Sequence, residues 1–248
     1  MPQTLGLIGS GAIGSTLARL AVAAGIDVVL SNSRGPESLA DLVAELGPRA
    51  GAATPEQAAR AGDLVVVTIP LIAYDRLPAD ALAGKTVLDT MNYYPQRDGL
   101  MDEFESDRIT SSTLVQQHLA GATVVKAFNN IAAHQLGTLA RPAGAPDRSA
   151  LPVAGNDAQA KRDAARLIDR LGFDTVDIGT LEDSWRSEPT TPVYVAPYQG
   201  TPPTGLGEAE RFHWGLQAPG VPVPAATVLE LVGMAERGPV RAGIVPGV

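Results

Sequence analysis

Short apolar runs alternate with alanine-rich segments along the first 180 residues. Residues 64–69 form a continuous, mostly β-branched run that ends at Pro70, which is typical of a strand buried on both faces of a parallel sheet. Residues 12–24 place apolar side chains three to four positions apart, which predicts a helix. The alternation predicts a doubly wound α/β fold with a mostly parallel sheet of seven to eight strands. By these criteria we expect strands at 4–8, 27–30, 49–52, 64–69, 86–90, 123–128, 151–154 and 173–178, and helices at 12–24, 36–46, 54–61 and 157–171.

The chain from Thr180 on has a different composition, with half of the prolines and both tryptophans. Flexible proline-rich linkers are usually poor in aromatic residues. We therefore expect residues 184–207 to be extended but docked, covering either the active site or a second subunit. Residues 225–237 form the only helix that we expect in this tail, and the residues from Gly238 on are expected to be loose.

A glycine-rich loop follows the first predicted strand and opens the first predicted helix. In this position a GxGxxG sequence indicates a Rossmann-like dinucleotide site. The first glycine permits the tight turn, the second lets the backbone approach a pyrophosphate, and the third allows close packing of helix on strand. The free N–H groups at the helix start would face the negative charge. The residues concerned are Gly9, Ser10, Gly11, Ala12, Ile13 and Gly14.

The end of the second predicted strand favours NADP(H) over NAD(H). An NAD site usually has an acidic residue there, which binds the ribose hydroxyls. This chain instead has Asn32, Ser33 and Arg34, and the next acidic residue is Glu37. A guanidinium can bind a 2′-phosphate through its charge and its fork of donors. We therefore expect an NADP-binding domain at residues 1–180 and an extension at 181–248.

Two further strand ends are expected to line the same cofactor, because ligands of such sheets lie outside the carboxyl ends of the strands. Thr68, Ile69 and Pro70 would lie beside the adenosine ribose or the pyrophosphate. Asn92 would lie nearer the nicotinamide. Asp89, inside its strand, is interpreted as a packed polar residue or a supporting group.

Three motifs in this order resemble the F420-dependent NADP oxidoreductase family: residues 6–14, residues 32–34 and the run Val125-Lys126-Ala127-Phe128-Asn129. The resemblance covers about residues 4–179. It implies a direct hydride transfer between NADP(H) and the deazaflavin coenzyme F420, which needs few acid–base residues. It also implies cofactor contacts at Ser10, Ala12, Ile13, Ser33, Arg34 and Pro70, and a nicotinamide and substrate segment at Phe128, Asn129, Asn130 and Ile131. No catalytic residue is assigned, and Lys126 is expected either in a buried ion pair or at the surface.

The second substrate is less clearly specified by the residues. Tyr93 and Trp185 are candidates for its wall, together with Asn129, Asn130 and Ile131, although the tail aromatics could equally serve as anchors. One alternative is an NADPH-dependent reductase of another small electrophile, such as an imine or a carbonyl. Residues 149–178 predict strand–helix–strand, which disfavours the reductase families that continue with a long helical domain. A second alternative is a non-catalytic NADP sensor whose pocket is filled by Tyr93, Tyr94 or Trp185.

Composition and charge narrow the class of protein further. The net charge of −8, without any Lys/Arg run, disfavours nucleic acid as a partner. The absence of cysteine excludes disulfides and thiol chemistry, and the three scattered histidines predict no metal site. Neither a membrane span nor a leader peptide is predicted, so a cytoplasmic protein is expected. We expect a homodimer, because the tail aromatics need burial.

Overall fold

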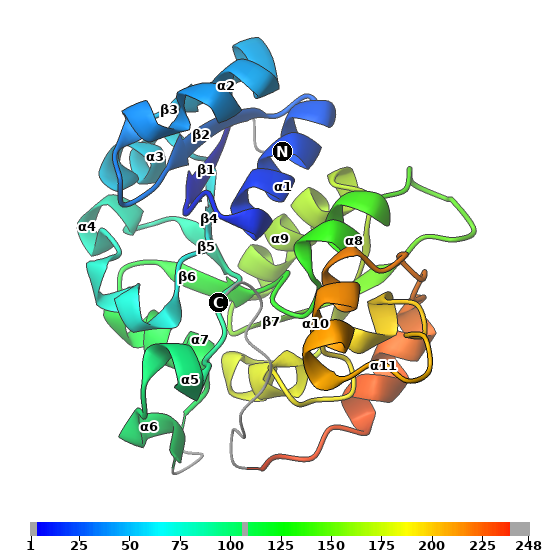
Figure 1. Ribbon diagram of the computed structural model, residues 1–248. Coiled ribbons are helices and arrows are strands. Elements are labelled where there is room, and N and C mark those ends of the chain that lie inside the picture. Colours follow the sequence, from blue (N-terminus) through cyan, green and yellow to red (C-terminus); the bar gives the residue numbers. More distant parts are fainter. Residues whose placement is uncertain (1–3, 106–108, 239–248) are drawn as a thin grey trace.

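The computed structural model describes residues 4–105 and 109–238. Within these ranges eight strands form one sheet in the order β3-β2-β1-β4-β5-β6-β7-β8, with helices on both faces (Figure 1). All neighbouring strands are parallel except β6 and β7, which are antiparallel. The expected doubly wound, Rossmann-like sheet is confirmed. The strands are β1 Thr4–Ile8, β2 Asp27–Ser31, β3 Ala50–Ala52, β4 Leu64–Val67, β5 Thr86–Asp89, β6 Thr123–Lys126, β7 Ala150–Gly155 and β8 Asp174–Asp177.

Helices cover both faces of the sheet because the strands in the middle of the sheet carry apolar side chains on both faces. In β4, Leu64 and Val66 belong to the hydrophobic core on one face, and Val65 and Val67 to the core on the other. This is the arrangement that a continuous apolar run predicts. The helices are α1 Ala12–Ala23, α2 Ala40–Leu46, α3 Pro55–Ala61, α4 Ala79–Leu82, α5 Pro95–Asp98, α6 Asp102–Glu105, α7 Ser111–His118, α8 Ala133–Thr138, α9 Ala158–Arg170, α10 Glu208–Gln217 and α11 Ala225–Gly233.

Several predicted boundaries are wrong, each for a local reason. The strand predicted at 64–69 ends at Val67, because the Thr68 side chain turns back to bond the glycine loop. The strand predicted at 123–128 ends at Lys126, because the backbone reverses at Phe128, where φ is +58°. The segment 36–46 starts as a 3-10 helix, Pro36–Leu39, before it continues as α2.

The tail contains more helix than the sequence predicted. Helix α10 was not expected, and it packs beside α8, where Gln135 donates to the carbonyl of Ala218 at 2.7 Å. The segment Leu181–Ser187 is a 3-10 helix, and the helix expected at 225–237 ends at Gly233. The expected loose end begins at Gly238, and residues 239–248 lie outside the described residues.

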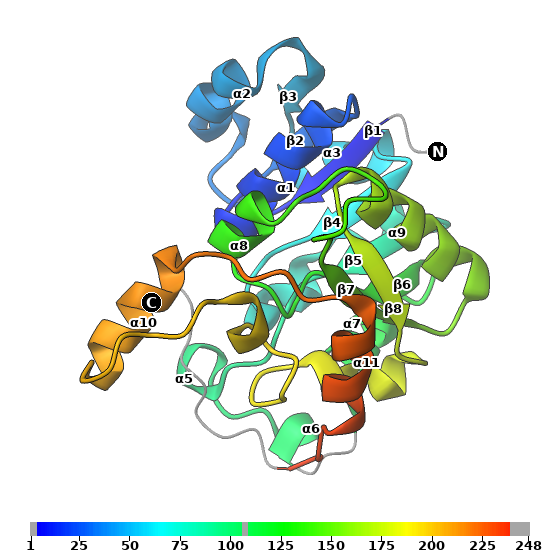
Figure 2. The ribbon, with the colours of Figure 1, turned by 90° about the vertical axis from the view of Figure 1, so that its right-hand side faces the viewer.

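The tail is docked on the body, as expected (Figure 2). Tyr198 is fully buried, and it shares one hydrophobic cluster with the sheet and with Val223, Val228 and Val232. The backbone of Ala150 in β7 donates to Val223 at 2.8 Å. Because Tyr198 is already buried by its own chain, it provides no reason for a dimer. No helix of the described ranges has the length and apolarity required to cross a membrane.

Candidate functional site

The glycine loop lies where the sheet order reverses around β1, and its glycines are required by close packing. Gly9 has φ +107°, and a Cβ there would lie 2.6 Å from the carbonyl oxygen of Thr68. A Cβ at Gly14 would collide with the Gly9 carbonyl. Thr68 fixes the turn by donating its hydroxyl to that same carbonyl at 2.9 Å. The loop and the carboxyl end of β4 are therefore locked together.

The middle glycine has a different environment. A Cβ at Gly11 would meet nothing within 4 Å, so space is open in front of the loop. Gly11 caps α1 without a side-chain hydrogen bond, and the first turn of the helix has no acidic residue. Ser10, Ala12 and Ile13 are all at least partly exposed around it. An open cradle with free backbone donors at a helix start suits a pyrophosphate.

The end of β2 presents a cation with no partner. Asn32 accepts the backbone N–H of Arg34 at 2.9 Å and bonds Ser38 at 2.8 Å, which shapes the loop. Arg34 and Ser33 are exposed, and within the described ranges the Arg34 guanidinium has no hydrogen bond or ion pair. Ser33 and Arg34, two of the three residues expected at a 2′-phosphate, are therefore exposed directly after β2, while Asn32 shapes the loop. Residues 68–70 follow β4, which lies on the other side of β1, with Ile69 half-buried and Pro70 exposed.

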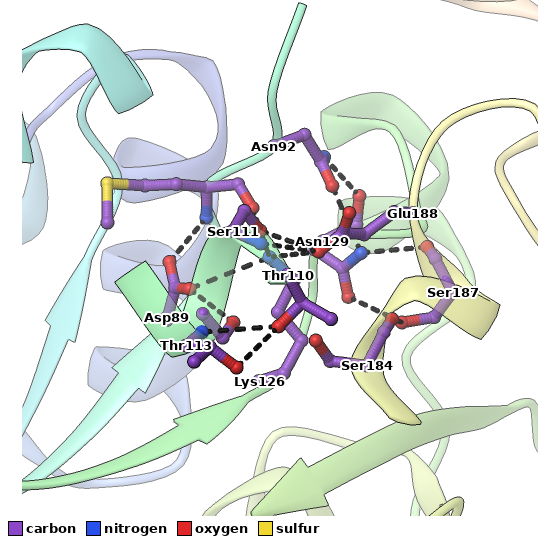
Figure 3. Close-up of polar contacts among 12 residues, drawn as sticks. Asp89, Asn92, Thr110, Ser111, Thr113, Lys126, Asn129, Ser184, Ser187 and Glu188 are labelled. Atoms are coloured by element: carbon purple, nitrogen blue, oxygen red, sulfur yellow. Dashed lines mark hydrogen bonds and ion pairs between the residues drawn. The ribbon is translucent and has the colours of Figure 1, made fainter. Parts of the chain in front are cut away.

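Asn92 and Asn129 pair directly across the ends of β5 and β6. Asn92 donates to the backbone carbonyl of Asn129 at 2.8 Å, and the Asn129 amide donates to the side-chain oxygen of Asn92 at 3.1 Å. Asn129 also donates to the backbone carbonyl of Ser187 at 2.7 Å (Figure 3). Phe128, at 1% exposure, turns the chain so that these amides meet. The structure therefore brings the two predicted nicotinamide-side amides together and adds the tail to them.

A buried ion-pair cluster lies beneath these amides (Figure 3). The Lys126 ammonium is 3.5 Å from Asp89 and 3.7 Å from Glu188, and it donates to the Met91 carbonyl and to Ser111. Lys126 and Asp89 are 1% and 0% exposed. Of the two alternatives for Lys126, the buried ion pair is confirmed. Because Glu188 comes from the tail, this cluster ties the tail to the carboxyl edge of the sheet.

Asn130 contacts the tail and Ile131 packs in the core, rather than lining an open cavity. Asn130 is fully buried and donates to the Val193 carbonyl and to the Tyr198 hydroxyl, both at 3.1 Å. Ile131 is 3% exposed and belongs to the main hydrophobic cluster. Their side chains therefore support the site from behind in this conformation.

Tyr93 and Trp185 lie together, but apart from the asparagine pair. They line one cleft with Phe104, Ile109, Glu188 and Arg237. Tyr93 is 1% exposed, packs on Phe104 at a ring distance of 4.5 Å, and donates its hydroxyl to the Gly99 carbonyl at 2.9 Å. The described lining of this cleft includes none of Asn129, Asn130 and Ile131. The predicted substrate residues thus form two groups.

Sequence reasoning assigned neither Ser187 nor Glu188 to this edge, and it included Tyr194 only within a tail run, residues 192–198, that could form a substrate wall. Each contacts a residue far away in the chain, and Tyr194 meets Tyr94 across 100 positions. No periodicity or motif signals such a contact. Within the described residues, no group of three or more His, Asp or Glu side chains is arranged to hold a metal ion.

Comparisons with known proteins agree with this geometry. Residues 4–93 match the family described as "NADP oxidoreductase coenzyme F420-dependent". The hypothetical protein SMa0349 of Sinorhizobium meliloti is 31% identical with a TM-score of 0.68, and the match covers 78% of this chain and 93% of that one. A protein of Arthrobacter sp. FB24, named "putative f420 dependent nadp-reductase", is 26% identical with a TM-score of 0.62, over 73% and 86% of the two chains.

A curated relative matches over a shorter segment. Protein YjhV of Escherichia coli K12 is 36% identical over 58 residues, which is 23% of this chain and 42% of that protein. The match therefore spans less than half of either chain. Together with the glycine cradle and the end of β2, the family match and the Sinorhizobium relative show that this chain belongs to the family of NADP oxidoreductases described as coenzyme F420-dependent.

Proposed function

We propose that this protein transfers a hydride between NADP(H) and a deazaflavin such as coenzyme F420, or a similar electrophile. The observation that carries the NADP(H) part is the open cradle at Gly11 together with the Arg34 guanidinium, which has no partner among the described residues. Backbone donors at the cradle suit a pyrophosphate, and a free cation suits a 2′-phosphate. Asn32 and Ser33 would share the phosphate with Arg34, and residues 68–70 would line the ribose.

The nicotinamide would lie over the paired amides at the ends of β5 and β6. When bound, NADPH supplies the hydride, and the protein supplies orientation and a dry surface. Asn92 and Asn129 are 6% and 4% exposed and hold each other in place, so neither needs to reorganise. A rigid, water-poor wall of this kind suits transfer between two ring systems held face to face.

The identity of the acceptor is supported by the family and by the name of the Arthrobacter relative. An imine or carbonyl acceptor is the alternative within the same reaction class. We also propose that residues 1–180 bind the cofactor while residues 181–248 complete the acceptor side, because Ser187 and Glu188 contact Asn129 and Lys126 at the end of β6. A homodimer and a cytoplasmic location remain predictions, and light scattering at micromolar concentration tests the first.

The test is anaerobic mixing of the protein with NADPH and oxidised F420 while the deazaflavin absorbance is followed. Rapid bleaching that requires NADPH supports the proposal. Tight NADPH binding without bleaching excludes F420, and a panel of imines and carbonyls then follows. If none of these acceptors is reduced, the sensor alternative is favoured.

The 2′-phosphate contact has its own test in Arg34→Ala. Loss of charge-assisted hydrogen bonds costs about 1.5–3 kcal/mol, so the Kd for NADPH should rise roughly 10- to 150-fold. The Kd for NADH should change little. Arg162→Ala is the matched control, because Arg162 bonds Gln159 on the outer face of α9. Equal losses for both nucleotides would contradict the assignment of Arg34.

A further inference from the structure

Two tyrosine hydroxyls meet at the carboxyl edge of the sheet. Tyr94 follows β5, and Tyr194 is carried in by the tail. Their hydroxyl oxygens form a short hydrogen bond, and the Tyr94 hydroxyl lies 3.5 Å from the Asn92 amide nitrogen. Asn92 is paired with Asn129, so the tyrosine pair borders the surface proposed for the nicotinamide. The proposed function so far assigns no role to either hydroxyl.

A strained turn holds Tyr194 in this position. Val195 has φ +55° and ψ −56°, and the N–H of Ala196 donates to the Tyr194 carbonyl at 2.6 Å, which makes a γ-turn with positive φ. Such turns are rare, and a β-branched residue at their centre is a conformational outlier. The N–H of Val195 donates to the Asn130 carbonyl at 2.9 Å, which anchors the turn on the loop after β6. Strained backbone that is over-determined in this way is concentrated at functional sites.

Burial of the pair favours the protonated hydroxyls. Burial raises the pKa of Tyr94 and raises the pKa of Tyr194 well above its ordinary value. The guanidinium of Arg97 lies 4.8 Å from the centre of the Tyr94 ring and lowers both pKa values, while Asp98 raises that of Tyr94. Both tyrosines are therefore neutral donors at pH 7, which suits an acid and not a base.

We propose that Tyr194 donates a proton to the heteroatom of the hydride acceptor and that Tyr94 positions the Tyr194 hydroxyl through their hydrogen bond. This inference rests on the proposed function. As a hydride adds to a carbon of the acceptor, the electron pair of the adjacent unsaturated system moves onto nitrogen or oxygen. The Tyr194 O–H bond breaks, and a bond from that proton to the heteroatom forms. Tyr94 keeps its proton and donates a hydrogen bond to the Tyr194 oxygen, and solvent then reprotonates Tyr194, which is the less buried of the two.

The same step serves each acceptor class that the proposed function allows. A deazaflavin, an imine and a carbonyl all gain negative charge on a nitrogen or oxygen when they accept a hydride. They differ in how strongly they need an acid, because charge spreads over a deazaflavin ring but stays on the oxygen of a reduced carbonyl. Tyr194 is thus assigned as a catalytic residue, and Tyr94 as a positioning residue that acts through it.

The test uses Tyr194→Phe, Tyr94→Phe and the control Tyr74→Phe in the full chain. Tyr74 packs edge-on against His118 at 5.8 Å and takes no part in the pair. We first measure the Kd for NADPH, which should be unchanged in all three variants. Single-turnover reduction by NADPH is then followed with oxidised F420, with 2-methyl-1-pyrroline and with an aromatic aldehyde. Because Tyr194→Phe removes the general acid, its single-turnover rate with the acceptor that the parent protein reduces should be lower by roughly 10²-fold or more.

A second readout does not depend on turnover. In the dead-end complex of the protein with NADP+ and the oxidised acceptor that the parent reduces, the ζ-carbon NMR signal of labelled Tyr194 should shift. The affinity of the acceptor should fall by roughly 2- to 10-fold in Tyr194→Phe, as expected for one lost hydrogen bond. In Tyr94→Phe the Tyr194 signal should still shift when the acceptor binds. The single-turnover rate should fall less than in Tyr194→Phe, and the dependence of that rate on pH should change.

The outcomes separate the inference from the function on which it rests. If the parent reduces none of the three acceptors, the proposed function fails and the inference fails with it. If the parent is active but Tyr194→Phe matches Tyr74→Phe in rate and the Tyr194 signal does not move, only the inference is overturned. Slower reduction with intact NADPH binding and a shifted Tyr194 signal supports it.

Discussion

Replacing Lys126 by methionine should destabilise the protein through the buried carboxylates that it leaves behind. Methionine has a similar length and fills the space of the lysine stem, so the main change is the loss of the ammonium. Asp89 is 0% exposed and lies 3.5 Å from that ammonium, and the Glu188 carboxylate lies 3.7 Å from it. Breaking a buried ion pair by removing one partner costs about 3–5 kcal/mol.

The structure indicates the lower end of this range. Asp89 keeps two other hydrogen bonds, from the Ser112 hydroxyl at 2.6 Å and from the Met91 N–H at 2.8 Å. Glu188 keeps the hydroxyl of Ser111 at 2.6 Å. We therefore expect a loss of about 3 kcal/mol, which for a chain of this size lowers Tm by roughly 6–12 °C.

The measurement is urea unfolding and thermal melting of the parent, the single variants Lys126→Met and Asp89→Asn, and the double variant Asp89→Asn/Lys126→Met. Removing the unpaired charge should recover part of the stability, so the two substitutions should not be additive. Glu45→Gln is the control, because the Arg19–Glu45 pair is about half-exposed on both sides and should not change Tm measurably. A melting temperature of Lys126→Met within 2 °C of the parent would refute the reasoning, as would strict additivity in the double variant.

Three further predictions concern the cradle, the tail anchor and the response to pH. Gly11→Ala should leave Tm unchanged and weaken NADPH binding, whereas Gly14→Ala should lower Tm, because only the Cβ at position 14 would collide with backbone. Equal melting curves for the two variants would contradict this. Tyr198→Phe removes the donor to the Ala150 carbonyl at 2.9 Å and should cost about 1–3 kcal/mol in urea unfolding. Hydrogen bonds from the Thr180 backbone and hydroxyl lower the pKa of Asp183. The ionised Asp183 therefore contributes fully to the stability of the fold above the ordinary aspartate pKa, and this contribution is lost as pH falls through the lowered pKa. Asp183→Asn should therefore lower the unfolding midpoint at pH 7 but not at a pH well below 4, and a constant difference would argue against the shift.

The sequence allowed the sheet and the cofactor loop to be predicted, because both are specified by neighbouring residues. The apolar run in β4 needs only its own pattern to indicate burial on two faces. The spacing of Gly9, Gly11 and Gly14 likewise fixes a turn, an open cradle and a close contact within six positions. The place of Arg34 directly after β2 is likewise readable from the sequence alone, and its role at a 2′-phosphate stays a prediction. Local patterns of this kind can be interpreted without knowing which remote residues contact them.

The acceptor side could not be predicted in the same way, since distant segments assemble it. Glu188 reaches Lys126, Ser187 reaches Asn129, and Tyr194 reaches Tyr94 only after the tail has packed on β7 and β8. Tyr93 illustrates a related case: the sequence predicts it at the substrate wall, but only the packed structure shows that it stacks on Phe104 and lines a cleft with Trp185.

The sequence by itself determined the α/β architecture and the glycine loop, and it predicts a phosphate site at the end of β2. Only the tertiary structure decided that the proline- and aromatic-rich tail folds back on its own chain and supplies polar groups to the sheet edge. The physical reason is that hydrogen bonds and ion pairs between remote segments leave no periodic trace in a sequence. Their energy depends on burial and distance, which exist only in the folded chain.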